Sequence, residues 1–219
     1  MDGRHFGLFC ASVANSNTIF VGVPVNLALF GEASLPYVLL YYFANTVLLW
    51  TAGQYAIARD VPERSRAIPA RIRLGQVFSP PLLGFLLGLA LTLCGVGLPD
   101  CLQTVARQLG NLTTPLALLF IGISIHDMGA RSLRVSKDMA LLLAGRMCLA
   151  PLLMWGLLRL ADVPPLMGRV FVIQASLPVV VQAAVLSAQF RTDAAFGAQA
   201  VTLSTLLSIV TVPLLMVLL

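Results

Sequence analysis

Long apolar segments alternate with short polar links along the whole chain. A transmembrane helix needs about 20 apolar residues, and seven segments reach about that length. We expect spans at residues 6–31, 34–58, 76–98, 101–126, 138–160, 164–190 and 193–219. The longest polar stretch runs from Arg59 to Arg73 and separates the first two segments from the other five. The pattern predicts an all-α polytopic membrane protein with seven transmembrane helices.

The composition excludes most soluble proteins. Hydrophobic residues make up 58% of the 219-residue chain and charged residues 11%, against roughly 25% charged residues in an ordinary soluble domain. A soluble enzyme of this size needs a more charged surface, and a disordered chain has far fewer apolar residues. The net charge of +5 does not indicate a nucleic-acid partner, because there is no soluble basic face to carry it.

Sequence motifs for catalysis, metals and pigments are absent. The four cysteines form no CxxC pair, and His5 and His126 are the only histidines, so we expect no metal site and no cofactor. Neither HExxH nor GxSxG occurs, which argues against an enzyme. A seven-helix membrane receptor stays an alternative, although the only lysine, Lys137, falls in a loop where a retinal would not attach.

Basic residues lie mainly on one side of the predicted spans. With the amino terminus placed inside, the inside loops hold most of the 14 basic residues, namely Arg4, the five arginines of 59–73, Arg131, Arg134, Lys137 and Arg191. Cytoplasmic loops carry an excess of Lys and Arg. We therefore expect a basic cytoplasmic loop at 59–75, a cytoplasmic amino terminus and an external carboxyl terminus, in a plasma membrane such as the bacterial inner membrane.

Two of the segments carry a proline near the middle, with polar residues around it. Pro24 follows Asn17 in the first segment, and Pro178 lies between Ser176 and Gln182 in the sixth. Proline removes a backbone hydrogen bond, and the freed groups must be satisfied by protein or by a water-lined cavity. Interrupted helices at matching places in two halves indicate a transporter binding site near the middle of the membrane.

The interrupted segments also predict an internal repeat. Five spans separate the two units, so the second unit is upside-down relative to the first. Residues 76–219 then form a complete five-span repeat, and residues 1–58 form the end of the other repeat.

Short motifs support this interpretation along the whole chain. They are Asn17–Pro24 (NTIFVGVP), Pro80–Gly88 (PPLLGFLLG), Leu109–Gly122 (LGNLTTPLALLFIG) and Ser176–Pro178 (SLP). In this order they resemble the auxin efflux carrier family. The resemblance implies a ten-helix fold of two inverted five-span repeats with two crossing broken helices. The seven spans match spans four to ten, so the chain resembles a family member that lacks the first three.

Polar residues beside the breaks are the candidate substrate ligands. The resemblance places a substrate-contacting asparagine at Asn17, whose amide can bond a carboxylate without adding charge to the bilayer. The other candidates are Gln182, Ser176, Asn15 and Arg146, with Pro24, Pro178 and Gly22 as determinants of the breaks. Each has a structural alternative, because membrane amides also join helices and a long arginine can reach the membrane surface. Ser204, Ser208 and Thr211 share a helix face and either line a pathway or bond their own helix.

The function that follows is a secondary transporter, or permease. It would move a small organic anion, such as a dicarboxylate or an auxin-like carboxylate, by alternating access. Its partners would be that anion and membrane lipid, and a homodimer is one assembly that the fold allows. The alternatives are a truncated fragment that does not transport and the seven-helix receptor.

Overall fold

The computed structural model describes residues 5–60, 80–112, 115–116, 119 and 135–218, and these are mostly helical. The described residues contain no β-strand, only one isolated bridge between Ser16 and Val179. Most of the predicted basic loop 59–75 and the end of the predicted span 101–126 lie outside the described residues.

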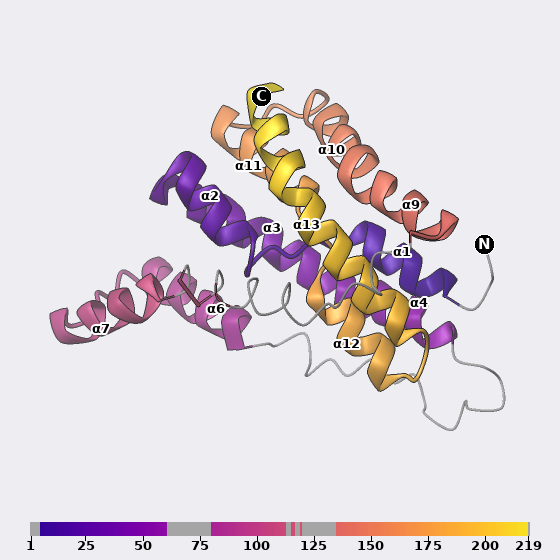
Figure 1. The fold of residues 1–219 in the computed structure, drawn as a ribbon. Coiled ribbons are helices and arrows are strands. Elements are labelled where there is room, and N and C mark those ends of the chain that lie inside the picture. The colour runs from indigo at the N-terminus through magenta and orange to yellow at the C-terminus, as the bar shows by residue number, and fades with distance from the viewer. Residues whose placement is uncertain (1–4, 61–79, 113–114, 117–118, 120–134, 219) are drawn as a thin grey trace.

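The amino-terminal part forms an interrupted helix followed by a long continuous one (Figure 1). The elements are α1 (Phe6–Ala14), α2 (Gly22–Phe30), the 3₁₀ turn η1 (Glu32–Ser34), α3 (Leu35–Leu48), the π-helical turn η2 (Leu49–Gly53) and α4 (Gln54–Arg59). The predicted span 6–31 is therefore two half-helices, α1 and α2, and the predicted span 34–58 corresponds to η1 through α4.

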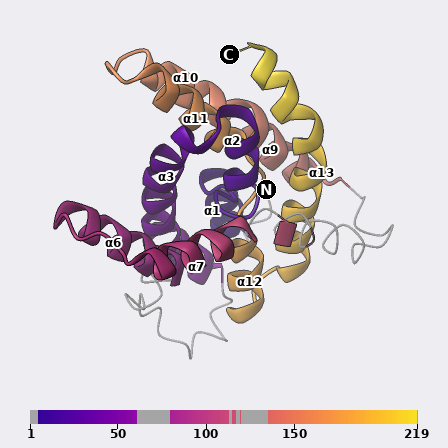
Figure 2. The ribbon, with the colours of Figure 1, turned by 90° about the vertical axis from the view of Figure 1, so that its left-hand side faces the viewer.

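Two helices in the middle of the chain extend away from the rest. They are α6 (Pro80–Leu93) and α7 (Asp100–Asn111), and Figures 1 and 2 show both at one side of the other helices. None of the residues of α7 is buried. These two helices therefore take no part in the core described below.

The carboxyl-terminal part repeats the combination of continuous and interrupted helices. The elements are α9 (Lys137–Ala144), the π-helical turn η5 (Gly145–Leu149), α10 (Ala150–Leu158), α11 (Pro165–Ser176), α12 (Val181–Gln189) and α13 (Ala194–Leu218). The predicted span 164–190 is interrupted between α11 and α12. The spans predicted at 138–160 and 193–219 correspond to α9 through α10 and to α13.

Three continuous helices of the described chain are long and apolar enough to cross a membrane. They cover Glu32–Arg59, Lys137–Leu158 and Ala194–Val217. The interrupted segments do not meet that measure because each half-helix is short. The count of seven spans and the inverted repeat therefore stay predictions, whereas the structure shows a mostly helical chain with three helices long and apolar enough to cross a membrane.

The first interruption lies earlier than the sequence indicates. The helix is broken at residues 15–21, and Pro24 is the third residue of α2 rather than part of the break. Proline is tolerated in the first turn of a helix, because the N–H that it lacks has no intrahelical partner there. Pro178 does lie in a break, between the end of α11 and the start of α12.

The core lies between α1 and the helices around it (Figure 2). Its largest cluster includes Leu8, Ile57, Met139, Leu186 and Phe196, which come from α1, α4, α9, α12 and α13. Gly7 brings α1 close to α4, since a Cβ at that position would collide with the Ala56 carbonyl. Many leucines point outward instead, as expected where the solvent is lipid.

Candidate functional site

The two helix interruptions cross and bond to each other. The backbone N–H of Asn17 donates to the Pro178 carbonyl at 2.9 Å, and the N–H of Val180 donates to the Asn15 carbonyl at 3.2 Å. The bridge between Ser16 and Val179 is antiparallel. Backbone groups released by each break are thus satisfied by the other break, as a low-dielectric interior requires.

Side chains from two continuous helices hold this crossing. Asn45 of α3 makes two bonds to Ser16, because its Oδ1 accepts the Ser16 N–H at 2.9 Å and its Nδ2 donates to the Ser16 carbonyl at 3.1 Å. From α13, the Ser204 hydroxyl accepts the Val179 N–H at 3.0 Å. Sequence reasoning missed Asn45, and the signal for it was an amide within the predicted apolar span 34–58.

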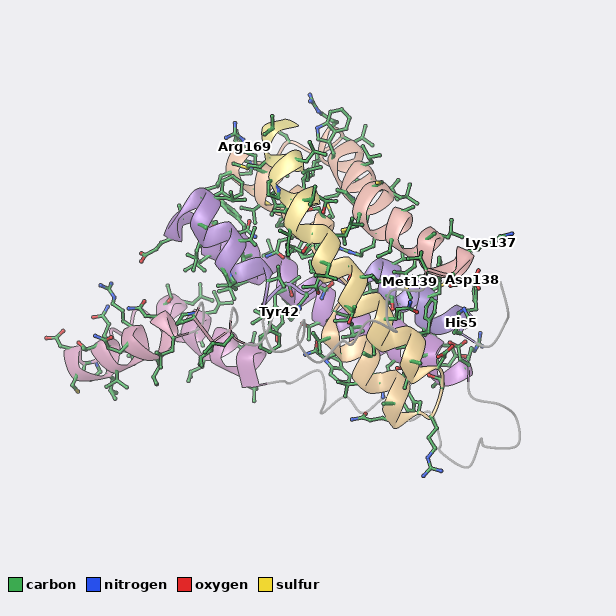
Figure 3. All side chains as sticks on the ribbon, in the orientation of Figure 1. His5, Tyr42, Lys137, Asp138, Met139 and Arg169 are labelled. Carbon is green, nitrogen blue, oxygen red and sulfur yellow. The ribbon has the colours of Figure 1, made fainter. Side chains whose placement is uncertain are left out.

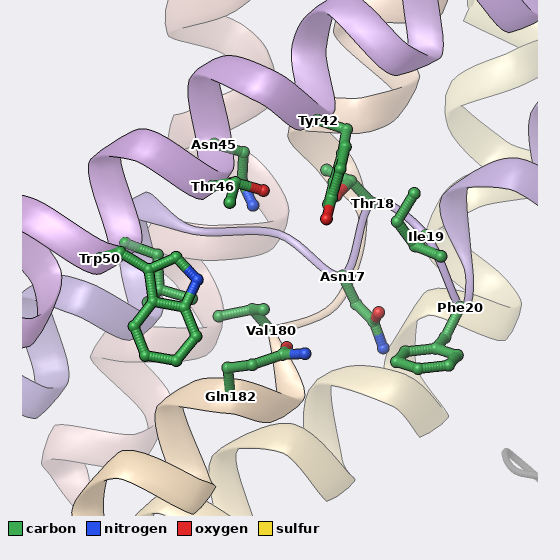
Figure 4. A pocket seen from close by; sticks show the side chains of 11 residues that line it. Asn17, Thr18, Ile19, Phe20, Tyr42, Asn45, Thr46, Trp50, Val180 and Gln182 are labelled. Carbon is green, nitrogen blue, oxygen red and sulfur yellow. The ribbon is translucent and has the colours of Figure 1, made fainter. Parts of the chain in front are cut away.

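A cavity of about 240 Å³ opens beside the crossing (Figure 4). Its walls come from the first break, from α3 and η2, and from the start of α12. The lining residues are Asn17, Thr18, Ile19, Phe20, Tyr42, Asn45, Thr46, Leu49, Trp50, Val180 and Gln182. In Figure 4 the amide of Gln182 points toward the side of the cavity where Asn17 lies. The structure thus brings together two of the predicted ligands.

Among the described residues, the lining combines amides and hydroxyls with aromatic rings and holds no ionisable acid or base except the phenol of Tyr42. The amino-terminal ends of α2 and α12 begin at Gly22 and Val181, next to lining residues of the two breaks. Helix amino termini carry partial positive charge, although the N–H groups of Gly22 and Val23 already donate to the Asn17 and Ile19 carbonyls. Together with the amide and hydroxyl donors of the lining, this charge suits an anion better than a cation. Sequence reasoning did not foresee that Phe20, Tyr42 and Trp50 would border this cavity.

The comparisons with known proteins agree with this architecture. A family model described as "Membrane transport protein" matches residues 1–216. The chain belongs to this family. It is the family of the auxin efflux carriers, so the resemblance drawn from the sequence motifs is confirmed.

Two relatives in this membrane transport family are archaeal. An "uncharacterized transporter" of Methanothermobacter thermautotrophicus is 31% identical over 214 residues, which cover 97% of this chain and 67% of that protein. An "uncharacterized transporter" of Methanocaldococcus jannaschii is 23% identical over 217 residues, which cover 97% of this chain and 68% of that protein. The chain is therefore a membrane transport protein by family.

Asn15 and Ser176, also predicted as ligands in this member of the family, lie away from the cavity. The Asn15 side chain is buried and its Nδ2 donates to the Ala11 carbonyl at 2.9 Å, one turn back in α1. The Ser176 hydroxyl donates to the Ile173 carbonyl at 2.8 Å, within its own helix. Neither residue lines the cavity that Asn17 and Gln182 share.

Arg146 lies behind the crossing and not in the cavity. Its side chain is 1% exposed, and it therefore does not reach the membrane surface. Its nitrogens donate to the carbonyls of Val13, Ala175 and Leu177 and to the Ser16 hydroxyl, at 2.6–2.9 Å. Arg146 thus contacts both interrupted helices from a third one.

Gly22 forms a close contact between the two interrupted helices of this carrier fold. A Cβ at residue 22 would lie 2.5 Å from Gln174 Oε1 and 2.8 Å from Leu177 Cδ1. Gln174 is fully buried, and neither polar atom of its amide has a hydrogen-bond partner. Of the three residues predicted as determinants of the breaks, Gly22 and Pro178 therefore lie at the crossing, and Pro24 lies two positions after Gly22 in the first turn of α2.

The face of α13 that carries Ser204, Ser208 and Thr211 has two predicted roles, to line a pathway or to bond its own helix. Ser204 and Ser208 donate to carbonyls of their own helix, those of Val201 and Thr205. Ser204 also accepts the Val179 N–H from the second break. None of the three face residues lines the cavity beside Asn17.

Acidic residues gather at the end of the bundle where α1 begins (Figure 3). Asp60 accepts the Gly7 and Leu8 N–H groups at 2.8 Å each, and thereby caps α1. Burial raises the pKa of the Asp60 carboxyl, although these two bonds and nearby His5 act in the other direction. Nε2 of His5 lies 3.2 Å from Asp138. Within the described residues, no group of three or more His, Cys, Asp or Glu is placed to hold a metal ion.

Proposed function

We propose that this chain is a secondary transporter for a small organic anion, such as a dicarboxylate or an auxin-like carboxylate, which it moves by alternating access. The observation that carries the proposal is the cavity at the crossing of two interrupted helices, with the amides of Asn17 and Gln182 in its wall. Membership of a membrane transport family supports the general class.

The chemistry of the cavity supports an anion. Hydrogen bonds from neutral amides to a charged group contribute about 1.5–3 kcal/mol each. The partial positive charge at the starts of α2 and α12 adds to this. A carboxylate can therefore be held without a buried basic residue in the wall. The volume of about 240 Å³ lies below the roughly 300–1,000 Å³ of typical ligand pockets, which favours a small substrate.

The same proposal includes a topology. The seven spans would place the amino terminus in the cytoplasm and the carboxyl terminus outside, with the second interrupted helix inverted relative to the first. The antiparallel bridge between Ser16 and Val179 and the basic residues of 59–73 support this arrangement. The membrane would be the plasma membrane of the cell.

The test compares acids with their neutral amides. The 219-residue chain is placed in lipid nanodiscs, and its thermal unfolding is followed with malonate, malonamide, indole-3-acetate and indole-3-acetamide. A ligand at 100 times its Kd stabilises a protein by about 2.7 kcal/mol. We expect at least one acid to raise the Tm and its amide to leave the Tm unchanged. That acid is then tested for uptake into proteoliposomes.

Two results would contradict the proposal. One is a Tm that neither acid changes, and the other is an equal rise with acid and amide. Binding without uptake would identify an anion-binding protein that does not transport.

A further inference from the structure

Arg146 is a buried charge that donates to carbonyl and hydroxyl oxygens, and Tyr41 lies beside it. It lies on the π-helical turn η5, in the middle of the continuous helix Lys137–Leu158. Burying a charge inside a membrane protein is strongly unfavourable unless the protein compensates it. Single π-turns of this kind often occur at functional sites. A charge kept in this position therefore calls for a function.

The acceptors of Arg146 are the carboxyl-terminal ends of the interrupted helices. Val13 lies in the last turn of α1, and Ala175 and Leu177 lie at the end of α11. The last carbonyls of a helix have no intrahelical partner and carry partial negative charge. Its Nη1 donates to the Val13 carbonyl at 2.7 Å, its Nη2 to the Ala175 carbonyl at 2.6 Å and its Nε to the Leu177 carbonyl at 2.9 Å. The guanidinium thus joins two negative helix ends.

The fourth bond connects Arg146 to the substrate side of the crossing. Its Nη2 donates to the Ser16 hydroxyl at 2.7 Å, and Ser16 precedes Asn17 in the first break. The backbone N–H of Asn17 is itself bonded to Pro178. The position of Asn17 in the cavity wall therefore depends on a backbone segment that Arg146 holds from behind.

The crossing consequently has two electrostatic sides. The ends of α1 and α11 face the guanidinium, whereas the starts of α2 and α12 adjoin the cavity with Asn17 and Gln182. Three carbonyls and one hydroxyl are also the kind of oxygen set that binds a hard metal cation. Here the guanidinium of Arg146 already donates hydrogen bonds to these four oxygens.

We propose that Arg146 is the positioning residue of the anion cavity. Its guanidinium is a built-in cation that fixes the ends of both interrupted helices, so that the cavity binds its anion without an inorganic cation. This inference rests on the proposed function, because it concerns the same cavity. It differs from a role as substrate ligand, since every nitrogen of Arg146 already donates to the protein and the residue does not line the cavity.

The first test replaces the side chain and then returns its charged group. Arg146→Ala is purified with guanidinium chloride at millimolar, non-denaturing concentration, and its Tm and its affinity for the acid identified above are measured with and without the ion. We expect the affinity to fall roughly tenfold or more without guanidinium. A fall of this size corresponds to the loss of about one hydrogen bond to a charged group. Guanidinium should restore both quantities, and sodium or potassium chloride at equal concentration should restore neither.

Two further variants separate positioning from general stability. Arg146→Lys keeps the charge but offers one compact ammonium in place of a planar fork, so we expect it to regain part of the Tm and less of the affinity. Arg159→Ala is the matched control, because Arg159 is exposed and stacks on Trp155 instead of contacting the crossing. It should bind the acid like the unaltered protein.

The outcomes that overturn the inference are distinct from failure of the proposed function. Unchanged affinity in Arg146→Ala, or a Tm of that variant that guanidinium does not raise, would overturn it. If the unaltered protein bound the acid in sodium or potassium chloride but not in choline chloride, the inference that Arg146 is a built-in cation would be overturned. If the unaltered protein binds none of the acids in any salt, the proposed function fails, and with it the positioning role.

Discussion

The backbone N–H of Asn17 donates a 2.9 Å hydrogen bond to the carbonyl of Pro178 and so joins two breaks that lie far apart in the sequence. This bond uses only the main chain of Asn17, and the Asn17 side chain lines the cavity. The backbone of Asn17 is therefore structural, whereas its amide belongs to the candidate site. A side-chain substitution can test the second role without removing the first.

We expect Asn17→Ala to weaken anion binding while folding is largely preserved. A membrane amide that only joins helices contributes about 0.6 kcal/mol on average. A bond to a charged group contributes about 1.5–3 kcal/mol, which is roughly 10- to 150-fold in affinity. Tm and the affinity for the bound acid should be measured on the same nanodisc sample.

The control for this prediction is Asn111→Ala, which removes an exposed amide at the end of α7. It should change neither quantity. A lower Tm together with unchanged affinity in Asn17→Ala would make Asn17 a packing residue.

Gly22→Ala should destabilise the crossing. The new Cβ would lie 2.5 Å from Gln174 Oε1 and 2.8 Å from Leu177 Cδ1, so α2 and α11 must separate or the buried amide must move. Overpacking of this kind costs about 1–3 kcal/mol. The matched control is Gly84→Ala in α6, where a Cβ meets no atom of the described residues within 4 Å, and where alanine in a helix favours folding by about 0.5–1 kcal/mol. Equal Tm values for the two variants would contradict the close contact.

The Asp60 carboxyl predicts a dependence of stability on pH. Burial raises its pKa, against the two N–H bonds from Gly7 and Leu8 and the charge of His5. The folded state therefore binds the Asp60 proton more tightly than the unfolded state does, where the pKa is about 3.9. The resulting stabilisation is complete below the unfolded pKa and is lost as the pH rises through the folded pKa.

The measurement compares the Tm of the unaltered chain with that of Asp60→Asn across the acid range. The difference between them should shift in favour of Asp60→Asn as the pH rises from about 4. Asp100→Asn is the control, since Asp100 is exposed in the first turn of α7. Parallel curves for Asp60→Asn and the unaltered chain would show that burial of this carboxyl does not govern its titration.

Sequence reasoning succeeded where the decisive feature was local. Amides beside a proline are visible in a single segment, so the two interrupted helices followed from the pattern. Asn17 and Gln182 both line the cavity, and their role as ligands stays a prediction. The exact break was not visible, because proline is compatible both with a break and with the first turn of a helix, as Pro24 shows.

Contacts between distant segments could not be read in the same way. Arg146 was recognised as an unusual intramembrane charge, but its partners are mostly backbone carbonyls, which every residue has. Trp50 and Tyr42 border the cavity only because α3 and η2 pass beside the first break. The pairing of Asn45 with Ser16 depends on the same packing, since periodicity records which face of a helix is polar and not which backbone that face meets.

Asn45→Ala provides the final test, because Asn45 holds the first break from outside it. Its amide makes two buried bonds to the Ser16 backbone, at 2.9 and 3.1 Å. Removing it leaves an N–H and a carbonyl without their partner, and each such group costs about 1–3 kcal/mol. We expect a clear fall in Tm, larger than that of Asn17→Ala. Thr51→Ala is the matched control, since the Thr51 hydroxyl bonds only carbonyls of its own helix and its loss should change the Tm little. A Tm of Asn45→Ala equal to that of Thr51→Ala would mean that the main-chain bonds between the two breaks hold the crossing without Asn45.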